Sequence, residues 1–232
     1  MTPFKIKMAT FSLVATLATA ASAQSLVTAR FADISVNLVI PKGHCVIPRD
    51  DELGVLHYKL QEDGNRGRSK VAILFADCKE WSNRQANPAL LLKNHGNYLL
   101  QLTEGRELLL PPTVSRSDVV QIYLDHEKKK LGAKDDLSEI IKKRLADSTV
   151  TAPSIEGSVN VGLIDHDSRA AYLGVGSTMN YEGTLVRVIG VTGATAIRAV
   201  PTTINLYGPA AQGNPFRGDL RFGANDPVRM RG

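Results

Sequence analysis

The two cysteines and the two histidines near them are the residues in this sequence with the most evident chemistry. Cys45 and Cys78 are the only cysteines, and His44 and His57 lie close to the first of them. A free Cys45 beside an imidazole could act as a nucleophile. A hydrolase with dispersed residues could instead use His44, His57 and Asp51. Neither set forms a catalytic motif, so both remain hypotheses.

The start of the chain favours a disulfide over a free thiol. Lys5 and Lys7 precede an apolar run that closes in small residues at Ala23, which are the three parts of a secretory signal peptide. We expect cleavage near Ala23 and a mature protein in the periplasm, or secreted. Because an oxidising compartment favours disulfides, we predict that Cys45 pairs with Cys78.

The sequence predicts three parts. A signal peptide covers residues 1–23, a single α+β domain covers 24–208, and a flexible basic tail covers 209–232. The tail is rich in proline, glycine and arginine and has little apolar periodicity, which is typical of disordered segments.

The tail also carries aromatic and basic side chains close together, which could bind an envelope protein or an anionic surface. A plain disordered end would have the same composition. The candidate partner-binding residues are Phe216, Arg217, Arg221 and Phe222.

Motifs and charge argue against several classes of protein. There is no nucleophile elbow, P-loop, dinucleotide fingerprint or zinc-protease motif. Asp165, His166 and Asp167 could ligate a metal, but a polar turn has the same composition, so we expect no metal and no cofactor. The net charge of +5 is too small for a nucleic-acid partner. No stretch after the signal peptide is apolar enough for a transmembrane segment.

The first half of the mature chain predicts strands around one early helix. We expect strands over 31–40, 71–75, 90–92 and 97–103, since these runs are rich in strand formers. Asp50 or Asp51 can cap a helix. Its apolar residues fall at spacings of three and four, which predicts that it lies on the sheet through Leu53, Leu56 and Leu60.

Two helices are predicted in the middle of the chain. The first begins at Ser115 or Ser117, ends at Lys130 and places Val119, Ile122, Tyr123 and His126 on one side. The second has an apolar face of Leu137, Ile140, Ile141 and Leu145. Their lysines and arginines could form a basic patch, but interspersed acidic residues are typical of an ordinary solvated surface.

From Ser154 the pattern has period two. It predicts three or four antiparallel strands with turns at 165–167, at 180–183 and near 190–193. Pro201 indicates an edge position or a bulge in the last strand. The fold class is therefore α+β, with an antiparallel sheet on which one early helix and two middle helices pack.

Four short stretches carry a family resemblance. They are Gly43-x-Cys45, Phe75-Ala-Asp-Cys78, Gly190-Val-Thr-Gly193 and Ile204-Asn-Leu-Tyr207. In this order the chain resembles uncharacterised exported proteins of Gram-negative, alphaproteobacterial bacteria, over residues 40–208. The arrangement of elements is similar to the PsbP-like and DcrB-like α+β sandwich. That resemblance implies an accessory or binding role and assigns no site residue.

The sequence therefore predicts an exported, non-catalytic binding or accessory protein of the bacterial envelope. An envelope hydrolase with dispersed catalytic residues is the alternative. A ligand groove could lie between helices and sheet, but we expect most of the aromatic residues concerned to be core or half-buried sheet residues. These residues are Trp81, Tyr98, Tyr123, Tyr172, Tyr181 and Tyr207.

Overall fold

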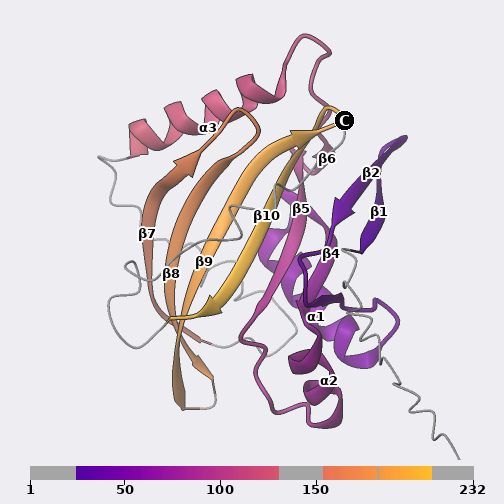
Figure 1. Ribbon diagram of the computed structural model, residues 1–232, viewed down its shortest axis with the longest axis vertical. Helices are drawn as coiled ribbons and strands as arrows, with labels where there is room; N and C mark the ends of the chain where they lie inside the picture. The colour runs from indigo at the N-terminus through magenta and orange to yellow at the C-terminus, as the bar shows by residue number, and fades with distance from the viewer. Residues whose placement is uncertain (1–24, 131–153, 182, 211–232) are drawn as a thin grey trace, which may run out of the picture.

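The computed structural model describes residues 25–130, 154–181 and 183–210 (Figure 1). The predicted signal peptide, the second middle helix and nearly all of the predicted tail lie outside these residues. The helices are α1 (Glu52–Asn65), α2 (Cys78–Ala86) and α3 (Arg116–Lys130). The strands are β1 (Leu26–Phe31), β2 (Ile34–Val39), β3 (His44–Val46), β4 (Ser69–Asp77), β5 (His95–Thr103), β6 (Arg106–Glu107), β7 (Ser154–His166), β8 (Ala171–Tyr181), β9 (Thr184–Ile197) and β10 (Val200–Pro209).

One large sheet organises these elements, and the predicted α+β class is correct at this level. Its strand order is β3-β4-β5-β10-β9-β8-β7, and the short β6 pairs with β5. All strand pairings in the described residues are antiparallel. Strands β1 and β2 form a separate hairpin. Figure 1 shows α1 and α2 near β4 and β5, and α3 near the other side of the sheet, close to β7.

The β1–β2 hairpin packs on one face of the sheet, which we call the hairpin face. Its fully buried side chains meet those of β4, β5 and β10 in one apolar cluster. The Tyr98 hydroxyl donates to the Val39 carbonyl over 2.6 Å, and the Glu107 carboxylate accepts from the Ala32 N–H and from Lys70. The cluster contains Phe31, Val36, Leu38, Ile40, Ile73, Phe75, Tyr98, Leu100 and Val200.

Helices α1 and α2 cover the opposite face, which we call the helix face. The Tyr58 hydroxyl of α1 accepts from the Leu74 N–H over 2.9 Å, beside the end of the three-residue strand β3. This bond satisfies a backbone donor that so short a neighbouring strand cannot pair. The core here contains Ile47, Tyr58, Val71, Leu74, Ala76, Trp81 and Leu99.

The predicted beginning of α1 is confirmed, but its predicted buried side is partly wrong. Asp51 is the N-cap, and its carboxylate accepts from the Leu53 N–H over 3.0 Å. The helix buries Gly54 and Tyr58, whereas Leu56 is 45% exposed. A Cβ at Gly54 would lie 1.8 Å from the Pro48 carbonyl oxygen. Because α1 lies this close to the backbone at Pro48, the side of the helix that contacts the rest of the protein is centred on Gly54.

The predicted first middle helix is confirmed as α3, with a different contact side. It buries Val119 and Val120 and packs against β7, β8 and β9. Ile122 is 61% exposed and His126 is exposed, although both were predicted on the packed side. The Arg116 guanidinium donates to the Ala196 carbonyl over 2.9 Å, which fixes the first turn of the helix at β9.

Two predicted strands in the first half need correction. Residues 31–40 do not form one strand, because the chain turns at Ala32 and Asp33 and pairs β2 with the unpredicted β1. Residues 90–92 form no strand. They precede β5, which begins at His95.

The predicted turn near residues 190–193 is also wrong. Strand β9 continues through these glycines, since Gly190 faces the Tyr207 ring and Gly193 faces Ile204 across the pairing with β10. The actual turn lies at Arg198 and Ala199, which both have positive φ. Small residues here make room for large neighbours rather than bend the chain.

Pro201 is not on an edge strand and no bulge occurs at it, but it lies just beyond the pairing of β10 with β5. It lies in β10, which is flanked by β5 and β9. Pairing with β5 begins only at Thr202, so on that side Pro201 has no strand neighbour to which an N–H would donate.

Candidate functional site

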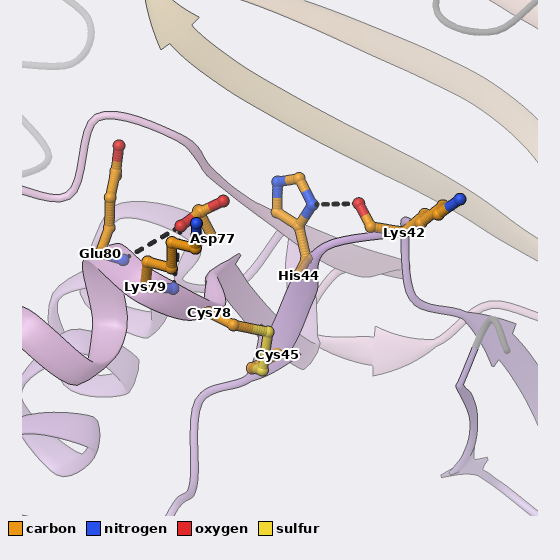
Figure 2. Close-up of a disulfide and its surroundings, with 7 residues drawn as sticks. All are labelled: Lys42, His44, Cys45, Asp77, Cys78, Lys79 and Glu80. Carbon is orange, nitrogen blue, oxygen red and sulfur yellow. Dashed lines mark hydrogen bonds between the residues drawn. A yellow bond between two sulfur atoms is a disulfide. The ribbon is translucent and has the colours of Figure 1, made fainter. Parts of the chain in front are cut away.

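The predicted disulfide is present and joins the edge strand β3 to the first residue of α2 (Figure 2). Cys45 pairs with Cys78, and the Cys78 N–H also donates to the Gly43 carbonyl over 3.0 Å. Because both cysteines are in this bond, neither is a resting thiolate nucleophile. The hypothesis of a thiol-dependent reaction at Cys45 is therefore wrong for this oxidised state.

Two carboxylates at the beginning of α2 accept hydrogen bonds from backbone N–H groups rather than face a substrate. Asp77 is its N-cap and accepts from the Lys79 and Glu80 N–H groups (Figure 2). The Glu80 carboxylate accepts from the Lys93 N–H over 2.7 Å and from the Asn94 N–H over 2.8 Å. Glu80 thus fastens the segment 87–94 to the helix.

His57 of α1 lies against α2. The Arg84 Nε–H donates to His57 Nε2 over 3.1 Å, and the imidazole meets the Trp81 ring edge-on at 5.9 Å. Since Arg84 only donates, Nε2 carries no hydrogen and the imidazole is neutral. Burial, followed by the Arg84 charge, lowers the His57 pKa to about 4. Arg84 also donates to the Leu90 carbonyl, so one guanidinium holds both α1 and segment 87–94.

His95 begins β5 on the helix face and was not singled out from the sequence. Its ring stacks on the Tyr207 ring of β10, with 5.2 Å between centroids. Its Nδ1 atom is enclosed and has no hydrogen-bond partner among the described residues. Burial lowers the His95 pKa to about 4, while the nearby Glu80 charge opposes this shift. Burial also raises the Tyr207 pKa to about 12.

The structure places His44, one of the three residues of the dispersed hydrolase hypothesis, on the opposite face of the sheet from His57. His44 is on the hairpin face, where its ring meets Phe75 at 5.6 Å and its Nδ1–H donates to the Lys42 carbonyl. His57 is on the helix side. Figure 2 shows His44 pointing away from the side of β3 that bears the disulfide. The Asp51 carboxylate caps α1 and accepts from Gln85 over 2.8 Å.

A row of amides and a hydroxyl crosses the helix face next to His95. Thr192 donates to Asn205 over 2.6 Å, Asn205 donates to Asn97 over 2.7 Å, and Asn97 donates to Gln61 of α1 over 3.0 Å. Asn97 and Asn205 are buried. Each group satisfies the next, so the row fixes the position of α1 over three strands.

The Asp165–Asp167 turn has a structural explanation. The Asp167 carboxylate accepts from the Arg169 and Ala170 N–H groups, and Asp165 accepts from the His166 N–H. Within residues 25–130, 154–181 and 183–210, no group of three histidine, cysteine, aspartate or glutamate side chains could hold a metal ion.

The aromatic residues that could have lined a groove do not gather at one site within the described residues. Trp81 is buried in the core of the helix face and Tyr98 in that of the hairpin face. Tyr123, Tyr172 and Tyr207 are half-buried on α3, β8 and β10. The tail residues Phe216, Arg217, Arg221 and Phe222, and the Tyr181 side chain, lie outside the described part of the chain.

Sequence reasoning missed three residues of this site, namely Glu80, Arg84 and His95. The spacing of Asp77 and Glu80 resembles a capping box and could have indicated α2. Nothing in the sequence links His95 to Tyr207, because strand pairing alone brings them together.

Comparisons with known proteins add little to this site. No protein-family model matches the sequence, and no curated protein matches it. The solved structure of the Ran-binding protein Mog1p of Saccharomyces cerevisiae is similar over 81% of this chain and 78% of that chain, with 11% identity and a TM-score of 0.30. None of the helices in the described segments is both long and apolar enough to span a membrane.

Proposed function

We propose that this protein is exported, is oxidised in the periplasm or outside the cell, and works by binding a partner in the bacterial envelope. In this proposal the mature chain begins near Ala23 and acts as an accessory protein. It belongs with exported alphaproteobacterial proteins and has a PsbP-like or DcrB-like sandwich.

One observation supports a binding role over a hydrolytic one. Three acid and base groups around α2 accept hydrogen bonds from the protein's own backbone or side chains. His57 accepts from Arg84, Asp51 from Leu53 and Gln85, and Glu80 from residues 93 and 94. A general base needs a free lone pair within reach of a substrate proton. These groups instead make the site rigid.

The disulfide supports export. Cytosolic thiols are kept reduced, whereas structural disulfides persist in oxidising compartments. Cys45 and Cys78 form such a bond between β3 and α2. Export predicts that the chain from cell envelopes has no thiol that reacts before reduction. A chain lacking residues 2–23 would stay in the cytosol with two reactive thiols. Free thiols in the envelope-derived chain would contradict the proposal.

The partner-binding part of the proposal assigns the contact to Phe216, Arg217, Arg221 and Phe222. Arginines and aromatics together suit an acidic partner surface, since guanidinium groups pair with carboxylates and rings supply apolar contact. The expected partner is an envelope protein with an acidic, partly apolar patch.

Crosslinking in cells of the protein's own source tests this function. A tag placed after Gln24 allows purification of the full chain and of a chain ending at Ala210. An envelope protein enriched with the full chain, and at least tenfold less with the shortened one, is the expected result. Purified partner should then bind the full chain directly. Two matched double variants test whether the tail arginines matter specifically or only through their charge. Arg217→Gln/Arg221→Gln removes two charges from the tail, and Arg66→Gln/Arg68→Gln removes two exposed charges elsewhere.

A further inference from the structure

We propose that His57 and His95 form an acid-sensitive latch, which holds α2 and segment 87–94 on the sheet at neutral pH and releases them when the two imidazoles take up protons. The proposal concerns a conformational change of the isolated chain and does not depend on the proposed binding function.

The first half of the latch is the contact between His57 and Arg84. The Arg84 Nε–H can donate to Nε2 only while that nitrogen has a free lone pair. A proton on Nε2 would remove this acceptor and place a cation next to the guanidinium. Arg84 also holds the Leu90 carbonyl, so its displacement would loosen segment 87–94 as well.

The second half is the enclosed ring of His95. Its Nδ1 has no partner among the described residues, and the ring is stacked on Tyr207. A proton there would place a charge in an apolar setting, and the hydrogen bond to the Leu92 backbone offsets only part of that cost, so protonation favours opening. Opening requires movement of α2 or of the chain just before His95.

The charges around the two rings do not compensate for burial, so a proton on either ring still favours opening. Arg84 and His95 disfavour a proton on His57, and only Asp51 favours it. His44 disfavours a proton on His95, while Glu80 and a hydrogen bond to the Leu92 backbone favour it. Tyr207 faces His95 and stays neutral, because burial raises its pKa to about 12. Burial is the largest effect on both histidines.

The pKa values in the held and released states determine in which direction a change of pH shifts the equilibrium between them. Each histidine has a pKa of about 4 when held and 6.5 when released. Well above pH 6.5 both states are neutral and the latch is unaffected. Between pH 6.5 and 4 the released state binds more protons, and at pH 5 each ring favours release roughly 30-fold. The Cys45–Cys78 bond keeps the start of α2 attached throughout.

Trp81 is a built-in probe of this event. It is the only tryptophan, it is 5% exposed, and it lies in α2 against His57. Release exposes the indole to water, so its emission should shift to longer wavelength. We expect a reversible transition with its midpoint between pH 6.5 and 4 in the oxidised mature chain. Emission that stays constant from pH 8 to 4 would overturn the proposal.

Matched variants assign the transition to these rings. His57→Gln keeps a neutral acceptor for Arg84 and cannot be protonated, so its midpoint should move to lower pH by half a unit or more. His166→Gln changes an exposed histidine in the β7–β8 turn and should titrate as the wild type does. An unchanged midpoint in His57→Gln would contradict the latch. If that variant does not fold, histidine NMR of the wild type decides, since a His57 or His95 ring that titrates near pH 6.5 while Trp81 stays buried refutes it.

Discussion

Loss of the Cys45–Cys78 disulfide should lower the stability of the folded chain by a predictable amount. The bond closes a loop with a sequence separation of 33 residues. For a loop of that length the chain-entropy relation gives about 12 cal/mol/K, or about 3.7 kcal/mol at 25 °C. This is a large share of the roughly 5–15 kcal/mol by which a native domain is stable. In a chain of this size it corresponds to a fall in Tm of roughly 8–15 °C.

The assay is urea unfolding of the mature chain, followed by circular dichroism with and without a reducing agent. A Cys45→Ser/Cys78→Ser variant is the control, and it should match the reduced wild type and ignore the reductant. Trp81 emission in the same samples shows whether α2 opens first. A stability difference below about 1 kcal/mol would refute the reasoning, because the unfolded chain would then gain little freedom on reduction.

Two further substitutions test the packing that positions the site. In Gly96→Ala the new Cβ would lie 2.2 Å from the Asn205 carbonyl oxygen and 2.6 Å from the Phe75 ring, so we expect a loss of roughly 2 kcal/mol or more by thermal unfolding. Gly157→Ala, where the Cβ meets nothing within 4 Å, should be nearly neutral, and equal losses would contradict this view of Gly96. Glu80→Gln keeps one oxygen for the N–H groups of residues 93 and 94 but replaces the oxygen that accepts from the Asn94 side-chain amide with an NH2 donor, at a cost of about 1–3 kcal/mol in urea unfolding. Glu62→Gln, which breaks an exposed ion pair with Arg49, should cost under about 1 kcal/mol, so a larger loss there than in Glu80→Gln would reverse the argument.

The sequence was sufficient for features with a local cause. Asp51 was identified as a possible cap because an acidic side chain there can accept from unpaired N–H groups, and the structure places it in that role. Strand β4 followed from its continuous apolar run. The disulfide followed from the predicted compartment and from the presence of only two cysteines.

Features set by distant parts of the chain were not predictable in the same way. Helix α2 has no apolar periodicity, since Trp81 is its one buried residue, and polar contacts hold it in place. Gly190 and Gly193 suggested a turn, but they are small because Tyr207 and Ile204 lie against them from the neighbouring strand. The buried side of α1 depends on the contact of Gly54 with Pro48.

The candidate site shows the same division. Cys45, Cys78 and His57 were visible in the sequence as a group. The partners that decide their chemistry were not, because Arg84 reaches His57 from α2 and Tyr207 reaches His95 from β10. Sequence proximity placed His44 with His57, whereas strand alternation puts His44 on the opposite face of the sheet.

We propose above all that this chain acts by binding an envelope partner. The most direct test of this binding is the comparison of proteins crosslinked in cells to the tagged full chain and to the chain ending at Ala210. We expect an envelope protein that is recovered with the full chain, binds it directly after purification, and is recovered at least tenfold less without the tail. Recovery of no specific protein with the full chain would contradict the binding function. Equal recovery with both chains would contradict the role of Phe216, Arg217, Arg221 and Phe222.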